Sequence, residues 1–197
     1  TQVKERSHTL LSPGLWGLVN NAGTSGCIGH NEWLSKADFT RVLDVNLVGL
    51  TEVMLSLLPL VQRAQGCIVN VASVGGRLSA YGGGYCISKY GMEAFSNSLR
   101  DCGVKVSITD SLEQLWSRVP AEVKEGYGQQ YLIRMLPSDN LRLVTDAMEH
   151  ALTARHPRTR YSCGWDAKLL YLPLSYLPTS WADLVLTCYQ PKPAQGS

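Results

Sequence analysis

Short apolar runs alternate with longer helical patterns over the first 110 residues of the chain. The runs at 15–20, 67–72 and 104–109 (LWGLVN, CIVNVA and VKVSIT) have the length and aliphatic content of buried strands. Between them, residues 37–65 and a segment from about 81 or 84 to 101 have the pattern of helices. Because strands that alternate with helices pair in parallel through right-handed crossovers, the pattern predicts a doubly wound α/β sheet.

The first of these helices is apolar on nearly every side, which is typical of a helix that is buried or lies in an interface. Ser35 stands three residues before Asp38, and this spacing predicts a capping box at the helix start. No uninterrupted run of 18 apolar residues occurs, so we predict no membrane-spanning segment.

The pattern weakens in the second half of the chain. The spacing of apolar residues predicts short helices at 111–118 and 122–133. It also predicts an amphipathic helix at 140–155. The tail from 161 to 188 is rich in aromatic residues and is interrupted by prolines. We interpret this tail in two ways: as an apolar lid or membrane-facing surface, or as ordinary core packing.

Composition narrows the class of protein. The chain has 197 residues, 45% of them hydrophobic, and a formal net charge of +2, which is a globular composition without the basic stripe of a dedicated nucleic-acid binder. The six cysteines show no CxxC spacing, so no metal or thioredoxin-type site is predicted. Cys67 and Cys86 lie in apolar runs and are predicted to be packed free thiols.

Tyr85 and Lys89 are the residues that suggest chemistry. They stand four apart in a predicted helix, so both side chains leave from one face. An ammonium beside a phenol stabilises the phenolate and lowers the tyrosine pKa. Such a tyrosine could take a proton from an alcohol or return one to a carbonyl. The same spacing is also that of an exposed helix pair, and the pair by itself does not decide between the two.

Two further polar residues sharpen the first alternative. Ser73 follows the strand at 67–72, and the carboxyl ends of parallel strands are where such sheets bind ligands. Its hydroxyl could bond the same substrate oxygen, or it could be an ordinary strand-end turn residue. Asn46 is polar within an apolar helix and needs partners. It is either a satisfied core asparagine or a residue whose carbonyl holds a water beside Lys89.

Four segments together resemble the short-chain dehydrogenase/reductase family. They are LVNNAG (18–23), LDVNLVG (43–49), VNVASVGGR (69–77) and YCISK (85–89), and their order and spacing match as a set. Longer stretches such as GGGYCISKYGMEAFSNSLR are similar to the microsomal retinol dehydrogenase and 3α/17β-hydroxysteroid dehydrogenase branch. The resemblance implies NAD or NADP as the cofactor, a hydrophobic alcohol such as a retinoid or steroid as the substrate, and no metal.

The resemblance also assigns roles to residues. Tyr85 would be the general acid/base, Lys89 would lower its pKa and bind the nicotinamide ribose, Ser73 would orient the substrate oxygen, and Asn46 would complete a proton relay. The cofactor-binding residues would be Asn20, Asn21, Ala22 and Gly23, together with Tyr85 and Lys89.

The same resemblance implies partners and organisation. Residues 1–109 would be the later part of a dinucleotide-binding domain and 110–197 a substrate lid packed on it. The helices at 37–65 and 85–100 would form a homodimer, and the protein would lie at the endoplasmic reticulum membrane. No nucleic-acid partner is implied.

The sequence departs from the family pattern in two places. The glycine-rich TGxxxGxG loop, the strands around it and the anchoring helix of this branch are not found in these residues, and a Pro-Gly turn expected after 104–109 is missing. We therefore expect an N-terminally shortened member with an internal deletion and weak cofactor binding. Two alternatives stay open: a catalytically inactive chain that associates with full-length partners, and an enzyme for another substrate class.

Overall fold

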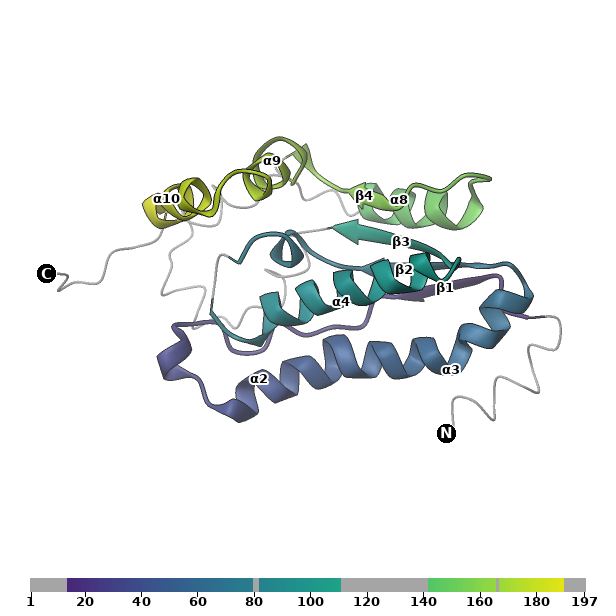
Figure 1. The fold of residues 1–197 in the computed structure, drawn as a ribbon, viewed down its shortest axis with the longest axis horizontal. Helices are drawn as coiled ribbons and strands as arrows, with labels where there is room; N and C mark the ends of the chain where they lie inside the picture. The colour runs from purple at the N-terminus through teal and green to yellow at the C-terminus, as the bar shows by residue number, and fades with distance from the viewer. Residues whose placement is uncertain (1–13, 80–81, 111–141, 166, 190–197) are drawn as a thin grey trace, which may run out of the picture.

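The structure is a computed structural model that describes residues 14–79, 82–110, 142–165 and 167–189. Its sheet has four parallel strands in the order β1-β2-β3-β4 (Figure 1). The strands are β1 (Gly17–Asn20), β2 (Cys67–Val71), β3 (Lys105–Asp110) and β4 (Arg160–Ser162). The predicted parallel α/β sheet and its first three strands are confirmed.

Helices cover both faces of this sheet (Figure 1). One face carries α2 (Lys36–Leu43), the π-helical stretch η2 (Asp44–Gly49), α3 (Leu50–Arg63) and α4 (Gly84–Asp101). The other face carries α8 (Arg142–Thr153), whose side chains pack with Val69 and Tyr161. Strand β2 is buried along its whole length because both of its faces are covered, which explains its continuous apolar run.

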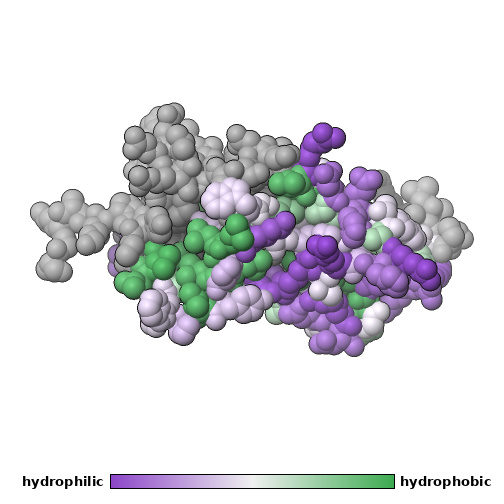
Figure 2. Space-filling model, turned by 90° about the horizontal axis from the view of Figure 1, so that it is seen from above, coloured by the Kyte–Doolittle hydropathy of each residue, from purple (hydrophilic) through white to green (hydrophobic). Residues whose placement is uncertain are grey.

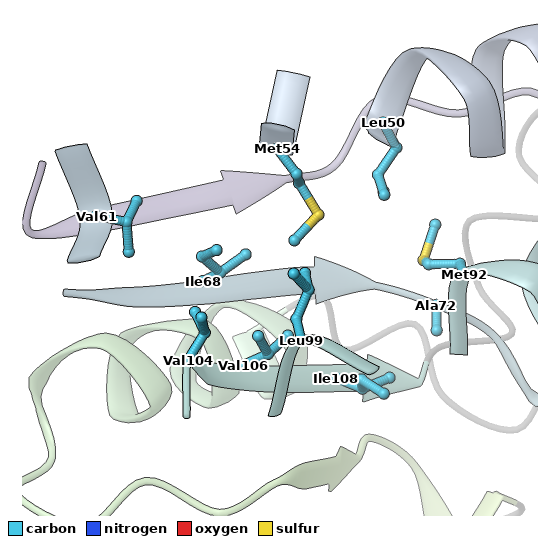
Figure 3. Close-up of a cluster of buried hydrophobic side chains, with 10 residues drawn as sticks. All are labelled: Leu50, Met54, Val61, Ile68, Ala72, Met92, Leu99, Val104, Val106 and Ile108. Carbon is cyan, nitrogen blue, oxygen red and sulfur yellow. The ribbon is translucent and has the colours of Figure 1, made fainter. Parts of the chain in front are cut away.

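The main core fills the space between the sheet and the layer of α3 and α4. Figure 3 shows its ten side chains, which come from these two helices and from β2, β3 and their ends. Met54 of α3, Ile68 of β2 and Met92 of α4 are almost completely buried. The free thiols of Cys67 and Cys86 are also buried, as predicted, and burial raises the pKa of the Cys67 thiol.

The helical segment from Lys36 to Arg63 begins as the sequence predicted. The capping box is present, with the Ser35 backbone N–H donating to Asp38 Oδ2 at 2.9 Å. This 28-residue segment is also long and apolar enough to cross a membrane, although it contains no uninterrupted apolar run of 18 residues. In this fold the segment covers one face of the sheet, because one of its sides packs on the sheet and on α4.

The C-terminal part of the described chain adds η4 (Ala167–Tyr171), α9 (Leu172–Ser175) and α10 (Thr179–Tyr189). The interpretation of the aromatic tail as core packing is confirmed for some of its residues, and other residues of the tail are exposed. Tyr171 and Leu174 pack with Val74 and Leu78, which lie just after β2. Other side chains are exposed and gather over the end of the molecule that carries α9 and α10 (Figure 2), among them Trp165, Leu169, Leu170, Tyr176, Leu177, Trp181 and Leu184.

One difference from the sequence prediction concerns the second half of the chain. Strand β4 was not predicted, because three residues of mixed polarity carry no strand pattern of their own and pair only through β3. The helix predicted at 140–155 is confirmed as α8. The helices predicted at 111–118 and 122–133 lie outside the described residues.

Candidate active site

The candidate site lies at the carboxyl ends of the parallel strands, where the chain leaves β2 and enters α4. Ser73 follows β2 and caps the short helix η3 (Val74–Gly76). Its Oγ accepts a hydrogen bond from the Gly75 backbone N–H at 3.1 Å, and its side chain is completely buried. The serine that the sequence left as either a turn residue or a substrate contact is therefore fixed in direction by its own turn.

Tyr85 and Lys89 lie in the first turns of α4 and both are buried, with 8% and 4% of their surface exposed. The alternative of an exposed helix pair is therefore wrong. The Lys89 ammonium donates to the carbonyl oxygen of Val71, at the end of β2, over 2.8 Å. Its Nζ lies 5.7 Å from the centre of the Tyr85 ring. A buried ammonium requires such partners, since burying it alone would be costly.

Gly75 brings the serine and the tyrosine together. A methyl group built on Gly75 would lie 3.3 Å from Cε1 of Tyr85 and 3.5 Å from Oγ of Ser73. Both groups therefore border the small space over this glycine. The three residues that the sequence singled out for proton transfer and substrate orientation converge at one edge of the sheet.

Asn46 connects this cluster with the loop after β1. It is completely buried in η2, and its amide oxygen accepts from the Thr24 N–H at 2.7 Å. Its amide nitrogen donates to the Thr24 carbonyl at 2.8 Å and to Ser88 Oγ at 3.0 Å. Ser88 in turn donates to the Tyr85 carbonyl at 2.6 Å. Asn46 is thus a fully satisfied asparagine, and its partners flank the Tyr85–Lys89 turn.

Thr24 and Ser88 are the members of this network that sequence reasoning missed. Ser88 stands three residues after Tyr85, so its position on the same helix face was a signal that could have been used. Thr24 contributes only backbone groups, and the sequence carries no signal for such a role. A π-helical turn such as η2 is rare and is often found at functional sites.

The residues predicted to bind a cofactor continue from the end of β1 at the same edge. The side chain of Asn20 donates to Asn70 Oδ1 at 2.8 Å, and Asn70 donates to Ser96 Oγ at 2.8 Å, so Asn20 ties β1 to the middle of the sheet. Asn21 and Ala22 are exposed and Gly23 is half-buried. These three residues form the loop surface beside the cluster.

Thr109 provides a test of whether this edge suits a polar ligand. It lies near the end of β3 opposite Val71, is completely buried, and its hydroxyl has no hydrogen-bond partner among the residues that the structure describes. Buried hydroxyls are almost always paired, so an unpaired one at the ligand-binding edge of a parallel sheet fits a site that receives a polar group. Together with the Lys89 ammonium and the Tyr85 hydroxyl, it gives a donor set that suits the sugar and amide groups of a nicotinamide nucleotide.

Comparisons with known proteins agree with this fold. The family model described as short chain dehydrogenase matches residues 2–134. Retinol dehydrogenase 16 of Rattus norvegicus is 52% identical over an alignment that covers 98% of this chain and 69% of that protein. The 17-beta-hydroxysteroid dehydrogenase type 6 of Homo sapiens is 53% identical, over 93% of this chain and 67% of that protein.

A solved structure has the same fold at lower sequence identity. The short-chain dehydrogenase from Streptomyces avermitilis superposes with a TM-score of 0.67 at 22% identity, over 93% of this chain and 73% of that chain. Fold and site thus define a Rossmann-like oxidoreductase framework. The chain belongs to the short-chain dehydrogenase family, in its retinol and hydroxysteroid dehydrogenase branch.

Proposed function

We propose that the chain carries the catalytic centre of an oxidoreductase that interconverts a hydrophobic alcohol and its carbonyl with NAD or NADP. The observation that carries this proposal is the convergence of Tyr85, Lys89 and Ser73 at the carboxyl edge of the sheet. The names of the two relatives reported above favour a retinoid or a hydroxysteroid as the substrate. The apolar residues of α9 and α10 are in keeping with a substrate of this kind.

The proposed mechanism assigns proton transfer to this chain's own residues. Tyr85 removes the proton from the alcohol hydroxyl, or returns it to the carbonyl oxygen in the reverse direction. Ser73 Oγ donates a hydrogen bond to the same substrate oxygen and fixes its position. Lys89, close to the Tyr85 ring, stabilises the phenolate form. When bound, the nicotinamide ring supplies or accepts the hydride.

The cofactor would be held by residues from both sides of this edge. Lys89 would bind ribose hydroxyls, Thr109 would donate to a polar group near β3, and Asn20–Gly23 would line the loop side. Asn46, through its bonds to Thr24 and Ser88, would keep this loop and the Tyr85 turn in register and complete a proton relay.

The experiment that tests the proposal replaces only the tyrosine hydroxyl. Tyr85→Phe should lower turnover of retinol or a hydroxysteroid by at least about 10²-fold, because general acid–base catalysis contributes that much. The readout is formation of NADH or NADPH from its absorbance. Tyr90→Phe is the matched control, since Tyr90 lies on the same helix, is 44% exposed, and should leave turnover unchanged. An active Tyr85→Phe variant, or a wild-type chain without turnover, would contradict the proposal.

A second candidate function is association with another copy of the chain or with a longer relative. The outer face of η2, α3 and α4 exposes apolar side chains in place of the polar residues that a free surface would carry: Val45, Val48, Leu55, Ile87 and Tyr90. A homodimer through these helices would cover this face whether or not the chain is catalytic.

The exposed apolar patch at α9 and α10 likewise favours contact with a membrane surface, in keeping with an endoplasmic reticulum location.

A further inference from the structure

Glu93 is a buried acid that the proposed mechanism does not use. It lies one turn after Lys89 on α4, and only 5% of its surface is exposed. Its Oε1 accepts a hydrogen bond from Arg160 Nη1 at 2.6 Å. Its Oε2 lies 3.4 Å from Nε of Arg77. The two arginines belong to different segments, since Arg160 begins β4 and Arg77 directly follows η3. One carboxylate thus joins three parts of the chain.

The turn that carries Ser73 rests directly on this part of α4. A methyl group built on Gly76 would lie 3.0 Å from the Lys89 carbonyl oxygen and 3.3 Å from Cγ of Glu93. No side chain separates the turn from the helix at this point. The position of the turn therefore depends on what holds it against α4, and the ion pair of the adjacent Arg77 with Glu93 is the charged contact that does so.

The Glu93 carboxylate neutralises the positive charges that surround it. Arg77 and Arg160 both direct a guanidinium group toward it. Arg100 lies further along α4, and its pKa is lowered, first by burial and then by the positive charge of Arg160. The positive charges of Arg77 and Arg160 thus meet at the one carboxylate of Glu93. Without the carboxylate, the two guanidinium groups would repel each other and the turn would lose its attachment.

We propose that Glu93 is a positioning residue that holds the Ser73 hydroxyl in place relative to Tyr85 and Lys89. Its two ion pairs fasten the η3 turn and β4 to α4, so that the small space over Gly75 keeps its shape. This inference rests on the proposed function, because a fixed serine hydroxyl matters for the proton-transfer step assigned above.

The test compares Glu93→Gln and Arg77→Met with Arg100→Met in the full chain. Arg100 is the matched control, because the charge of Glu93 acts on it as well, whereas its hydrogen bonds run to the Val106 carbonyl and to Asn97 and not to the turn. Hydrogen exchange of the amides at 75–78 reports on the turn, since these amides bond within it. In the first two variants we expect several-fold faster exchange there and a loss in kcat of about tenfold or more at little-changed KM, because small misplacements of this kind are costly. Arg100→Met should change neither.

Several outcomes separate this inference from a general loss of stability. Glu93→Asp should recover part of both effects, because it restores the charge with a shorter side chain. Unchanged exchange at 75–78 in both Glu93→Gln and Arg77→Met would overturn the inference. So would an equal loss of kcat in Arg77→Met and Arg100→Met at equal melting temperature. If Glu93→Gln does not fold, Arg77→Met decides the question alone. If the wild-type chain shows no turnover, the proposed function fails, whereas the exchange measurement still decides the role of Glu93.

Discussion

At the scale of single residues, the geometry of the site depends on Gly75, a position where only glycine leaves enough space. Gly75 lies between the Tyr85 ring, the Cys86 sulfur and the Ser73 hydroxyl, each within 3.5 Å of where a Cβ atom would stand. The 3.3 Å contact with Cε1 of Tyr85 is tight, so an added methyl group has to displace the tyrosine ring or the turn by a few tenths of an ångström, whereas the contacts with Cys86 and Ser73 are of ordinary length. The tyrosine ring is the more easily displaced of the two, because the backbone of the turn is held by α4.

Gly75→Ala should therefore damage activity more than stability. We expect at least a tenfold loss of kcat, as small misplacements of reacting groups cost about this much or more, with about 1 kcal/mol or less of lost stability. Gly103→Ala is the control, since no atom lies within 4 Å of its Cβ position but its φ of +80° strains any other residue. That variant should lose about 1 kcal/mol yet keep its turnover. Steady-state kinetics and thermal unfolding check both, and equal kinetics in the two variants would contradict the expectation.

The sequence predicted the residues of the site better than their partners. Tyr85 and Lys89 follow from helical periodicity, and Ser73 follows from its position after a strand. The bonds of Asn46 to Thr24 and of Glu93 to Arg160 join residues 22 and 67 positions apart. Such pairs depend on how the elements pack, and a single sequence gives no distance between them.

At the scale of elements, the predicted parts are those whose own residues determine their structure. Strands β1, β2 and β3 are apolar runs, and α4 and α8 carry clear helical patterns. Strand β4 differs, because its three residues become a strand only by pairing with the end of β3. The capping box before α2 was predictable because all of its contacts are local.

The capping box gives a pH-dependent prediction. The hydrogen bond from the Ser35 hydroxyl, followed by that from the Ser35 backbone N–H, lowers the pKa of Asp38 below its ordinary 3.8. A lowered pKa in the folded state means that the carboxylate stabilises the fold above this pH and that the benefit is lost as pH falls through the folded value. Asp38→Asn should therefore reduce the melting temperature at pH 7, and the difference from the wild-type chain should shrink as the pH falls below 3.8. A difference that is independent of pH would contradict this account.

At the scale of the whole molecule, the helical layer over the sheet has two unlike faces. The inner face of α3 and α4 forms the core. The outer face leaves Val48 and Leu55 more than half exposed, with Ile87 and Tyr90 of α4 nearby in the same layer. An apolar surface of this kind on a single copy favours an interface, whereas a fully solvated helix would carry polar residues there.

The oligomeric state tests this interpretation. The wild-type chain should elute as a dimer in size-exclusion chromatography with light scattering, and the double variant Val48→Glu and Leu55→Glu should elute as a monomer, because two charges would be buried in the interface. Leu143→Glu is the control, since Leu143 is exposed on α8 at the other side of the sheet and should leave the mass unchanged. A monomeric wild-type chain would exclude this face as a self-association surface.

The wide helical turn at Asp44–Gly49 limits how the length of this chain can vary. A π-helical turn holds one residue more than the regular helix that it interrupts. Because the wide turn already absorbs one extra residue, a further inserted residue would rotate one flanking helix against the other by about 100°. Either Asn46 would then turn away from Ser88, or Met54 would turn away from the core. Viable insertions among descendants of this sequence should therefore fall in loops rather than in this stretch of six residues.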